Sequence, residues 1–101
     1  MKIQGEPVYC EAGEFVLCKE SIGDKIMTSY LATHIGQIST VVKNEYVVVF
    51  YDENFPEFLA KHYFKNDGNY HIKRFNKNKI VFHSSNRRSI ESMLVGKRFD
   101  L

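Results

Sequence analysis

The sequence predicts a single, mainly β domain: a β-rich α+β fold of five to six antiparallel strands with two short helices. Two observations support this prediction. Segments of strand length rich in Val, Ile, Tyr and Phe recur along the chain, and turn residues separate them. Apolar residues make up 44% of the 101 residues, enough for a core, and no repeat or Pro-rich linker divides the chain. We therefore expect one domain over residues 1–101.

Six segments have the composition of strands. They are 14–19, 25–32, 35–42, 45–51, 69–75 and 79–83. The segment 45–51 is apolar on both faces, as in a central strand whose two faces are covered; an exposed second face would instead mark a partner surface. A tight hairpin is predicted at Lys43-Asn44, and residues 67–69 and 76–78 have turn chemistry.

A first helix is predicted at about 54–64, because its apolar side chains follow a helical spacing. They fall at positions i, i+3, i+4, i+7 and i+8: Phe55, Phe58, Leu59, His62 and Tyr63. Asn54 is the expected N-cap, Glu57 completes a capping box, and Pro56 is tolerated in the first turn.

A second helix is predicted at about 86–95. Apolar residues 90, 93 and 94 repeat the helical spacing after a Ser85-Asn86 cap, and Gly96 is expected just beyond the helix end. The tail 97–101 would then leave the helix. Phe99 and Leu101 either pack on the domain or dock on a partner, since the terminal peptide resembles short C-terminal peptides that bind sliding clamps.

Charge divides the chain more sharply than its net value of +2 suggests. Residues 1–60 carry four lysines and nine acidic residues, whereas residues 61–101 carry ten lysines or arginines and three acidic residues. This asymmetry favours a basic face for an anionic partner. The alternative is that the two parts interleave in the fold, so that the charges mix over the surface.

Cations and aromatic residues together suit nucleic acid, because cations replace phosphate counterions and aromatic rings stack on unpaired bases. The candidate nucleic-acid-binding residues are Tyr70, Lys73, Arg74, Phe75, Lys77, Lys79, Arg87, Arg88, Lys97 and Arg98. Strand alternation places Lys73 and Phe75 on one face of 69–75, and Tyr70 and Arg74 on the other. The alternative is a solvated surface whose lysines protect an edge strand.

The stretch 33–53 has a Gly that leads into an apolar strand, a short turn and a second strand. The residues at these places are Gly36, Ile38, Val41, Val47 and Val49. The stretch resembles the core of KOW-type and other SH3-like small barrels, and the resemblance covers about residues 12–83. It implies an SH3-like barrel. Barrels of this family often bind nucleic acids, ribosomal RNA or proteins, and some are transcription-associated factors of phages and bacteria.

These observations predict a noncatalytic module that binds DNA or RNA through a basic C-terminal surface, with a role in transcription as one option. The first alternative is a protein-protein interaction module, such as a small phage regulator or an inhibitor of a host enzyme. The second is a small nuclease or hydrolase built from Asp52 and Glu53 with Lys61 or His62. No nucleophile elbow, phosphate loop or paired-carboxylate signature occurs in the sequence, so no catalytic residue or cofactor is predicted.

The cysteines and histidines lack the close paired spacing of zinc fingers, so no metal site is predicted. Cys10 and Cys18 are expected to be reduced thiols that pack in the fold, because the N-terminus lacks the apolar stretch of an export signal. No segment approaches the length of a membrane span. We therefore expect a cytoplasmic protein with no membrane partner.

Overall fold

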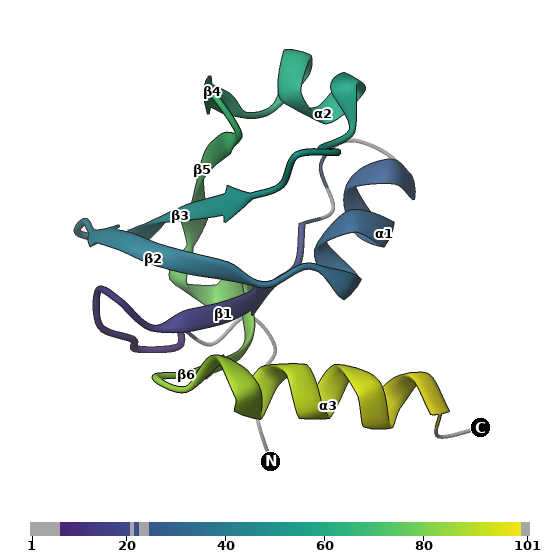
Figure 1. The fold of residues 1–101 in the computed structure, drawn as a ribbon. Helices are drawn as coiled ribbons and strands as arrows, with labels where there is room; N and C mark the ends of the chain where they lie inside the picture. The colour runs from purple at the N-terminus through teal and green to yellow at the C-terminus, as the bar shows by residue number, and fades with distance from the viewer. Residues whose placement is uncertain (1–6, 21, 23–24, 100–101) are drawn as a thin grey trace.

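The computed structural model describes residues 7–20, 22 and 25–99, with side chains described as far as residue 95. Six strands and three α-helices form this part of the chain, which confirms the predicted β-rich α+β class (Figure 1). The elements are β1 (Phe15–Cys18), α1 (Lys25–Thr33), β2 (Gly36–Val41), β3 (Glu45–Tyr51), α2 (Glu57–His62), β4 (Lys65–Asp67), β5 (Tyr70–Asn76), the 3-10 turn η1 (Lys77–Lys79), β6 (Ile80–Ser84) and α3 (Arg87–Phe99).

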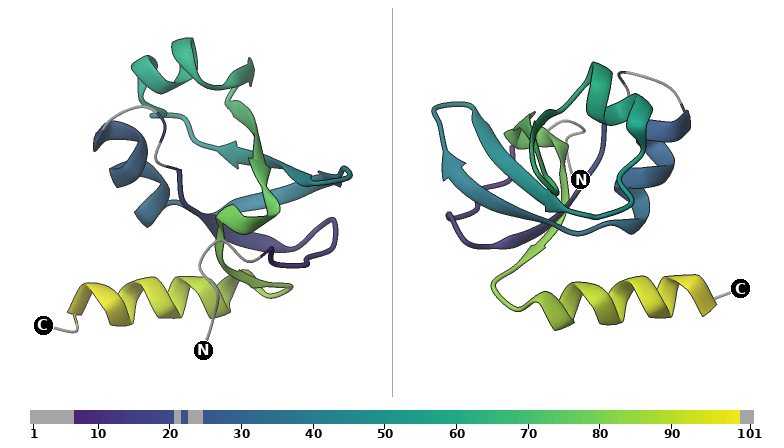
Figure 2. Two further views of the ribbon diagram at one scale, coloured as in Figure 1. Left: turned by 180° about the vertical axis from the view of Figure 1, so that it is seen from behind. Right: turned by 45° about the horizontal axis from the view of Figure 1, so that its top comes forward.

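The strands form one antiparallel sheet in the order β4-β5-β3-β2-β1-β6. β5 and β6 follow each other in the chain through η1, although three other strands separate them in the sheet. The sheet therefore has to bend strongly, and Figure 2 shows its strands curving around a common interior. Register shifts after Leu17 in β1 and between Ile38 and Thr40 in β2 are consistent with this curvature.

The core lies on the inner side of the curved sheet, where α1 and α2 close it. Its buried side chains alternate along β3 and continue onto the two helices: Tyr46, Val48, Phe50, Met27, Tyr30, Leu31 and Leu59. In β1, Val16 and Cys18 point into this core, so Phe15 and Leu17 point to the outer side. α3 packs there against β1 and β6, and its Ile90 is fully buried.

The prediction of a strand at 25–32 is wrong, because this segment forms the helix α1. Its buried residues, Met27, Tyr30 and Leu31, have the i, i+3, i+4 spacing of a helix, while Ile26 is exposed. The β-branched and aromatic residues of the segment resemble a strand by composition. Burial of one helical face against the core outweighs that weak preference.

The boundaries of the predicted helices also need correction. α2 begins at Glu57 after Pro56, no side chain caps it, and the amide of Asn54 instead binds the Asp52 carboxylate, so the predicted capping box is wrong. α3 continues through residue 96 to Phe99, which shows that the predicted stop at Gly96 is also wrong. The predicted cap of α3 is confirmed, because Asn86 accepts a hydrogen bond from the amide of Arg88 at 2.9 Å.

The predicted turns are confirmed. Val42 and Glu45 exchange backbone hydrogen bonds around the two-residue hairpin, and Gly68 adopts a φ of 61° in the turn between β4 and β5. The short edge strand β4 had no signal in the sequence because it has only three exposed polar residues. Among the described residues, no helix is both long and apolar enough to cross a membrane.

Candidate binding face of the sheet

One side of the sheet is largely uncovered beyond the reach of α3. Residues paired across strands point to the same side, and the register gives three rows on the outer side of β2, β3, β5 and β4. We call this surface the open face. Its residues are Gln37, Thr40, Val47, Val49, Tyr51, Lys65, Asp67, Tyr70, Ile72 and Arg74.

Two tyrosines dominate one end of the open face. Tyr51 of β3 and Tyr70 of β5 are direct cross-strand partners, and their ring centroids lie 5.0 Å apart in an edge-to-face arrangement. Tyr51 is 60% exposed and Tyr70 is 50% exposed. The second face of β3 is thus only partly covered. The sequence predicts a partner surface if this face is exposed.

The open face is hollowed on both sides of the tyrosine pair. A hollow of about 800 Å³ lies along Val47, Ile72 and Arg74 of the face and reaches Lys65. A second hollow of about 390 Å³ lies between Tyr51 and α3 and is lined there by Arg87, Glu91, Leu94 and Val95. Apolar and charged side chains therefore both line the two hollows.

The structure divides the predicted basic residues among several places. Tyr70 and Arg74 lie on the open face, but Phe75 is fully buried in the core. Lys73 points to the inner side, where its amine lies 4.7 Å from the Phe75 ring centroid. Lys77 lies over the rings of Tyr46 and Tyr9, whereas the guanidinium of Arg87 lies over Phe15.

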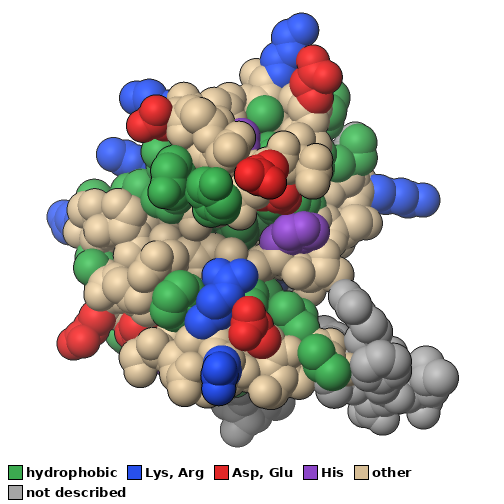
Figure 3. Space-filling model, in the orientation of Figure 1, with side chains coloured by type: hydrophobic (Ala, Val, Ile, Leu, Met, Phe, Trp, Pro, Cys, Tyr) green, Lys and Arg blue, Asp and Glu red, His purple; other side chains and the backbone are tan. Residues whose placement is uncertain are grey.

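Many of these cations also have acidic neighbours. Lys73 and Lys79 both lie within 4.0 Å of the Glu20 carboxylate, at 3.5 and 3.7 Å, and Arg74 lies 3.5 Å from Glu45. Arg87 pairs with Glu91 at 3.0 Å, whereas the described part of the structure gives Arg88 an exposed side chain without an ion pair. Figure 3 shows Lys and Arg side chains scattered over one face of the molecule, several of them beside acidic ones.

The remaining candidates lie at the end of the chain. Lys97 and Arg98 belong to α3 by their backbone, but their side chains are outside the described residues, as is the packing of 99–101. Of the ten predicted binding residues, the structure therefore brings Tyr70 and Arg74 together on the open face and places Arg87 at its margin. Tyr51 and Lys65 were not among the predicted residues, because only the strand register places them beside Tyr70 and Ile72.

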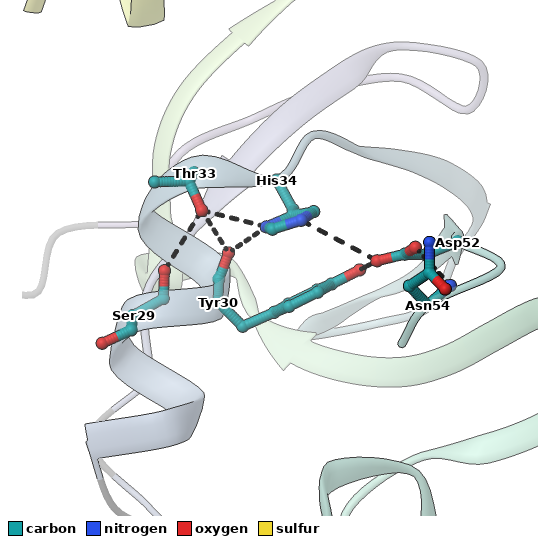
Figure 4. Close-up of polar contacts among 6 residues, drawn as sticks. All are labelled: Ser29, Tyr30, Thr33, His34, Asp52 and Asn54. Atoms are coloured by element: carbon teal, nitrogen blue, oxygen red, sulfur yellow. Dashed lines mark hydrogen bonds and ion pairs between the residues drawn. The ribbon is translucent and has the colours of Figure 1, made fainter. Parts of the chain in front are cut away.

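A polar cluster beside the second hollow connects α1 to the end of β3 (Figure 4). The hydroxyl of Tyr30 donates to Asp52 at 2.8 Å, and the ring of His34 stacks on Tyr30 with a centroid separation of 3.8 Å. Burial, with the hydrogen bond to Asp52 next in importance, raises the pKa of Tyr30 far above its usual value. Asp52 also accepts from the amide of Asn54, so this carboxylate is engaged in structural contacts.

Comparison with protein-family models, curated proteins and solved structures finds no match to this chain. Its function is therefore inferred from its own geometry and chemistry.

Proposed function

We propose that the chain is a noncatalytic binding module of the SH3-like small-barrel type that binds single-stranded nucleic acid on the open face. The observation that supports this proposal is the exposed pair Tyr51 and Tyr70 on the sheet. Exposed aromatic rings stack on unpaired bases, and each such contact contributes about 1–3 kcal/mol. The strand order β5-β3-β2-β1-β6, with a 3-10 turn between the last two strands of the chain, supports the small-barrel type.

Cations around the tyrosines would bind the phosphates. Lys65 lies in the row of Ile72, and among the described residues it has no ion-pair partner. Arg74 has a partner in Glu45, but the arginine side chain is 65% exposed and that of Glu45 is 39% exposed. An exposed pair of this kind contributes only about 0–1 kcal/mol, so a phosphate can replace the carboxylate at little cost.

The direct test is a fluorescence anisotropy titration of the protein into labelled single-stranded DNA or RNA of about 12 nucleotides. We expect binding at low salt, with log K falling against log salt at a slope of about −2 if Lys65, Arg74 and Arg87 each neutralise one phosphate. A duplex of the same sequence should bind more weakly, because its bases are already stacked on each other. No binding to either single strand at low salt would overturn the proposal.

A protein partner is the second candidate, and the balance of charge around the open face favours it. Three cations, Lys65, Arg74 and Arg87, lie on or beside the open face, and so do three acidic residues, Asp67, Glu45 and Glu91. Protein interfaces are enriched in Tyr and Arg with matched charges around an apolar centre. Affinity capture from nuclease-treated lysate, with a Tyr70→Ala protein as the matched control, distinguishes the two: a stoichiometric protein that only the wild type retains supports this candidate.

A further inference from the structure

Three side chains of types that can bind a metal ion converge where β1 begins. Cys10 and Glu14 come from the loop before β1, and His83 comes from β6, 69 residues after Glu14. One potential ligand atom from each of the three lies within 4.8 Å of the other two. We infer that these residues form a binding site for a divalent transition metal ion, with Zn²⁺ the best-suited ion.

The loop that carries two of the ligands is held firmly in place. The amide of Cys10 donates to the hydroxyl of Tyr46 at 2.6 Å, and that hydroxyl donates to the carbonyl of Val8 at 2.7 Å. The amide of Gly13, which has a φ of 96°, donates to the carbonyl of Ile38 at 2.8 Å. A ligand loop fixed in this way loses little conformational freedom on binding an ion.

β-sheet pairing brings the third ligand to the loop. His83 lies opposite Val16 in the register of β6 and β1, and its Nδ1 is 2.8 Å from Oε1 of Glu14. The Glu14 carboxylate and the His83 ring are therefore already in direct contact. In a tetrahedral zinc site two ligand atoms lie about 3.4 Å apart, so the pair has to open only slightly to admit the ion.

The donor set matches the chemistry of zinc. Thiolate, imidazole and carboxylate are the three side-chain types that bind Zn²⁺, and a water molecule can fill the fourth position. Cys10 would release its thiol proton to solvent, and His83 would ligate as a neutral ring, its Nδ1 proton moving to Nε2 through solvent if Nδ1 is the ligand atom. The thiolate and the Glu14 carboxylate would then balance the two charges of the ion. Mg²⁺ and Ca²⁺ prefer oxygen ligands alone, so they suit this set poorly. The side chain of His83 is 38% exposed, which leaves a path for the ion.

The consequence of metal binding would be structural. The ion would join the loop before β1 to β6, the last strand of the chain, and so reinforce the pairing of β1 with β6. Neither the cysteine spacing nor any other local pattern in the sequence predicts this site, because its ligands meet only through the pairing of β1 with β6. In the sheet, the strands β1 and β6 of this site are distant from Tyr51 and Tyr70 of the open face. The metal site therefore does not depend on the proposed function.

The test is a titration of the metal-free protein with Zn²⁺ against a chromophoric chelator, repeated with Co²⁺ to record its absorption spectrum. We expect one ion per chain, a thiolate-to-cobalt charge-transfer band, and a Tm that rises with zinc concentration. Cys10→Ser and His83→Gln should each lower zinc affinity more than about 100-fold, since loss of an outer-shell partner alone costs 10–100-fold. His62→Gln, a change to another surface histidine, should keep the wild-type affinity.

A measurement on the wild type tests the inference even if the variants fail to fold. Alkylation of Cys10 by iodoacetamide, followed by mass spectrometry, should slow at least about tenfold with stoichiometric Zn²⁺ and remain unchanged with Mg²⁺. Zinc affinity that is the same in Cys10→Ser and His83→Gln as in the wild type would overturn the inference. So would the absence of both zinc binding and protection of Cys10 in the folded wild type.

Discussion

Tyr51 and Tyr70 are direct partners on adjacent antiparallel strands, and both rings remain at least half exposed on the outer side of the sheet. Their edge-to-face contact at 5.0 Å orients each ring with respect to the other without burying either. A binding surface built in this way is preorganised, because two rigid aromatic groups need little reordering when a ligand arrives.

Removing one ring of this pair should weaken binding without unfolding the domain. We expect Tyr70→Ala to lower affinity for single-stranded oligonucleotide by about 1–3 kcal/mol, or roughly 5- to 150-fold, because one stacking contact is lost. Anisotropy titrations at fixed salt measure the change. Tyr9→Ala is the matched control, since Tyr9 is 74% exposed but lies off the open face; equal losses in both variants would contradict the proposed site.

The ion pair of Arg74 with Glu45 gives two variants with opposite expected effects. Arg74→Ala should reduce the magnitude of the salt slope by about 0.7, the value for one phosphate contact on a single strand. Glu45→Gln should raise affinity by up to about fivefold, because it removes the acid that competes with phosphate for Arg74. Arg88→Ala, on α3 outside the open face, is the control in the same titrations. A larger change in slope from Arg88 than from Arg74 would place the basic surface on α3 instead.

The sequence predicted most of the sheet because the signals of strands and turns are local. Alternating or continuous apolar runs and the turn at Lys43-Asn44 identified β2 and β3 to within about a residue. α1 was missed for a physical reason: its strand-like composition is a weak local preference, and the choice of helix depends on the core that Met27 and Leu31 join. Such tertiary burial has no local signal.

The candidate site was harder to predict, because faces and registers are properties of the whole sheet. Alternation correctly placed Lys73 with Phe75 and Tyr70 with Arg74, but each pair contains one aromatic residue and one cation. Nothing local distinguishes the inner pair from the outer pair. The charge asymmetry was also informative only in part, since Glu20 from the acidic part of the chain lies between Lys73 and Lys79.

Core side chains approach the backbone closely at Gly36 in β2. A Cβ atom added there would lie 2.5 Å from Cγ1 of Val48 and 3.0 Å from the ring of Phe50, and both of these side chains are buried. We expect Gly36→Ala to lower the free energy of unfolding by about 1–3 kcal/mol in urea denaturation, because the packed core has no room for a methyl group. Val48→Ala in the same chain should recover part of the loss, whereas simple additivity of the two changes would contradict the proposed clash.

Tyr30 makes stability depend on pH in the alkaline range. Burial raises its pKa in the folded state, and the Asp52 hydrogen bond adds to this effect, so the unfolded chain releases the phenolic proton first as pH rises. The contribution of Tyr30 to stability is thus complete below its unfolded pKa of about 10 and is lost progressively above that value, by up to about 1.4 kcal/mol per pH unit. Tyr30→Phe should be less stable at neutral pH by about 1 kcal/mol through loss of the hydrogen bond to Asp52, yet its stability should fall less steeply above pH 10.

Urea unfolding at a series of pH values measures both effects of the Tyr30→Phe change. Asp52→Asn is the control that separates them, because it weakens the hydrogen bond but keeps the ionisable phenol. Since burial is the larger cause of the raised pKa of Tyr30, the Asp52→Asn protein should retain a steep alkaline decline in stability. An equally steep decline in Tyr30→Phe would show that other groups control the alkaline limit and that the phenol of Tyr30 ionises in the folded state.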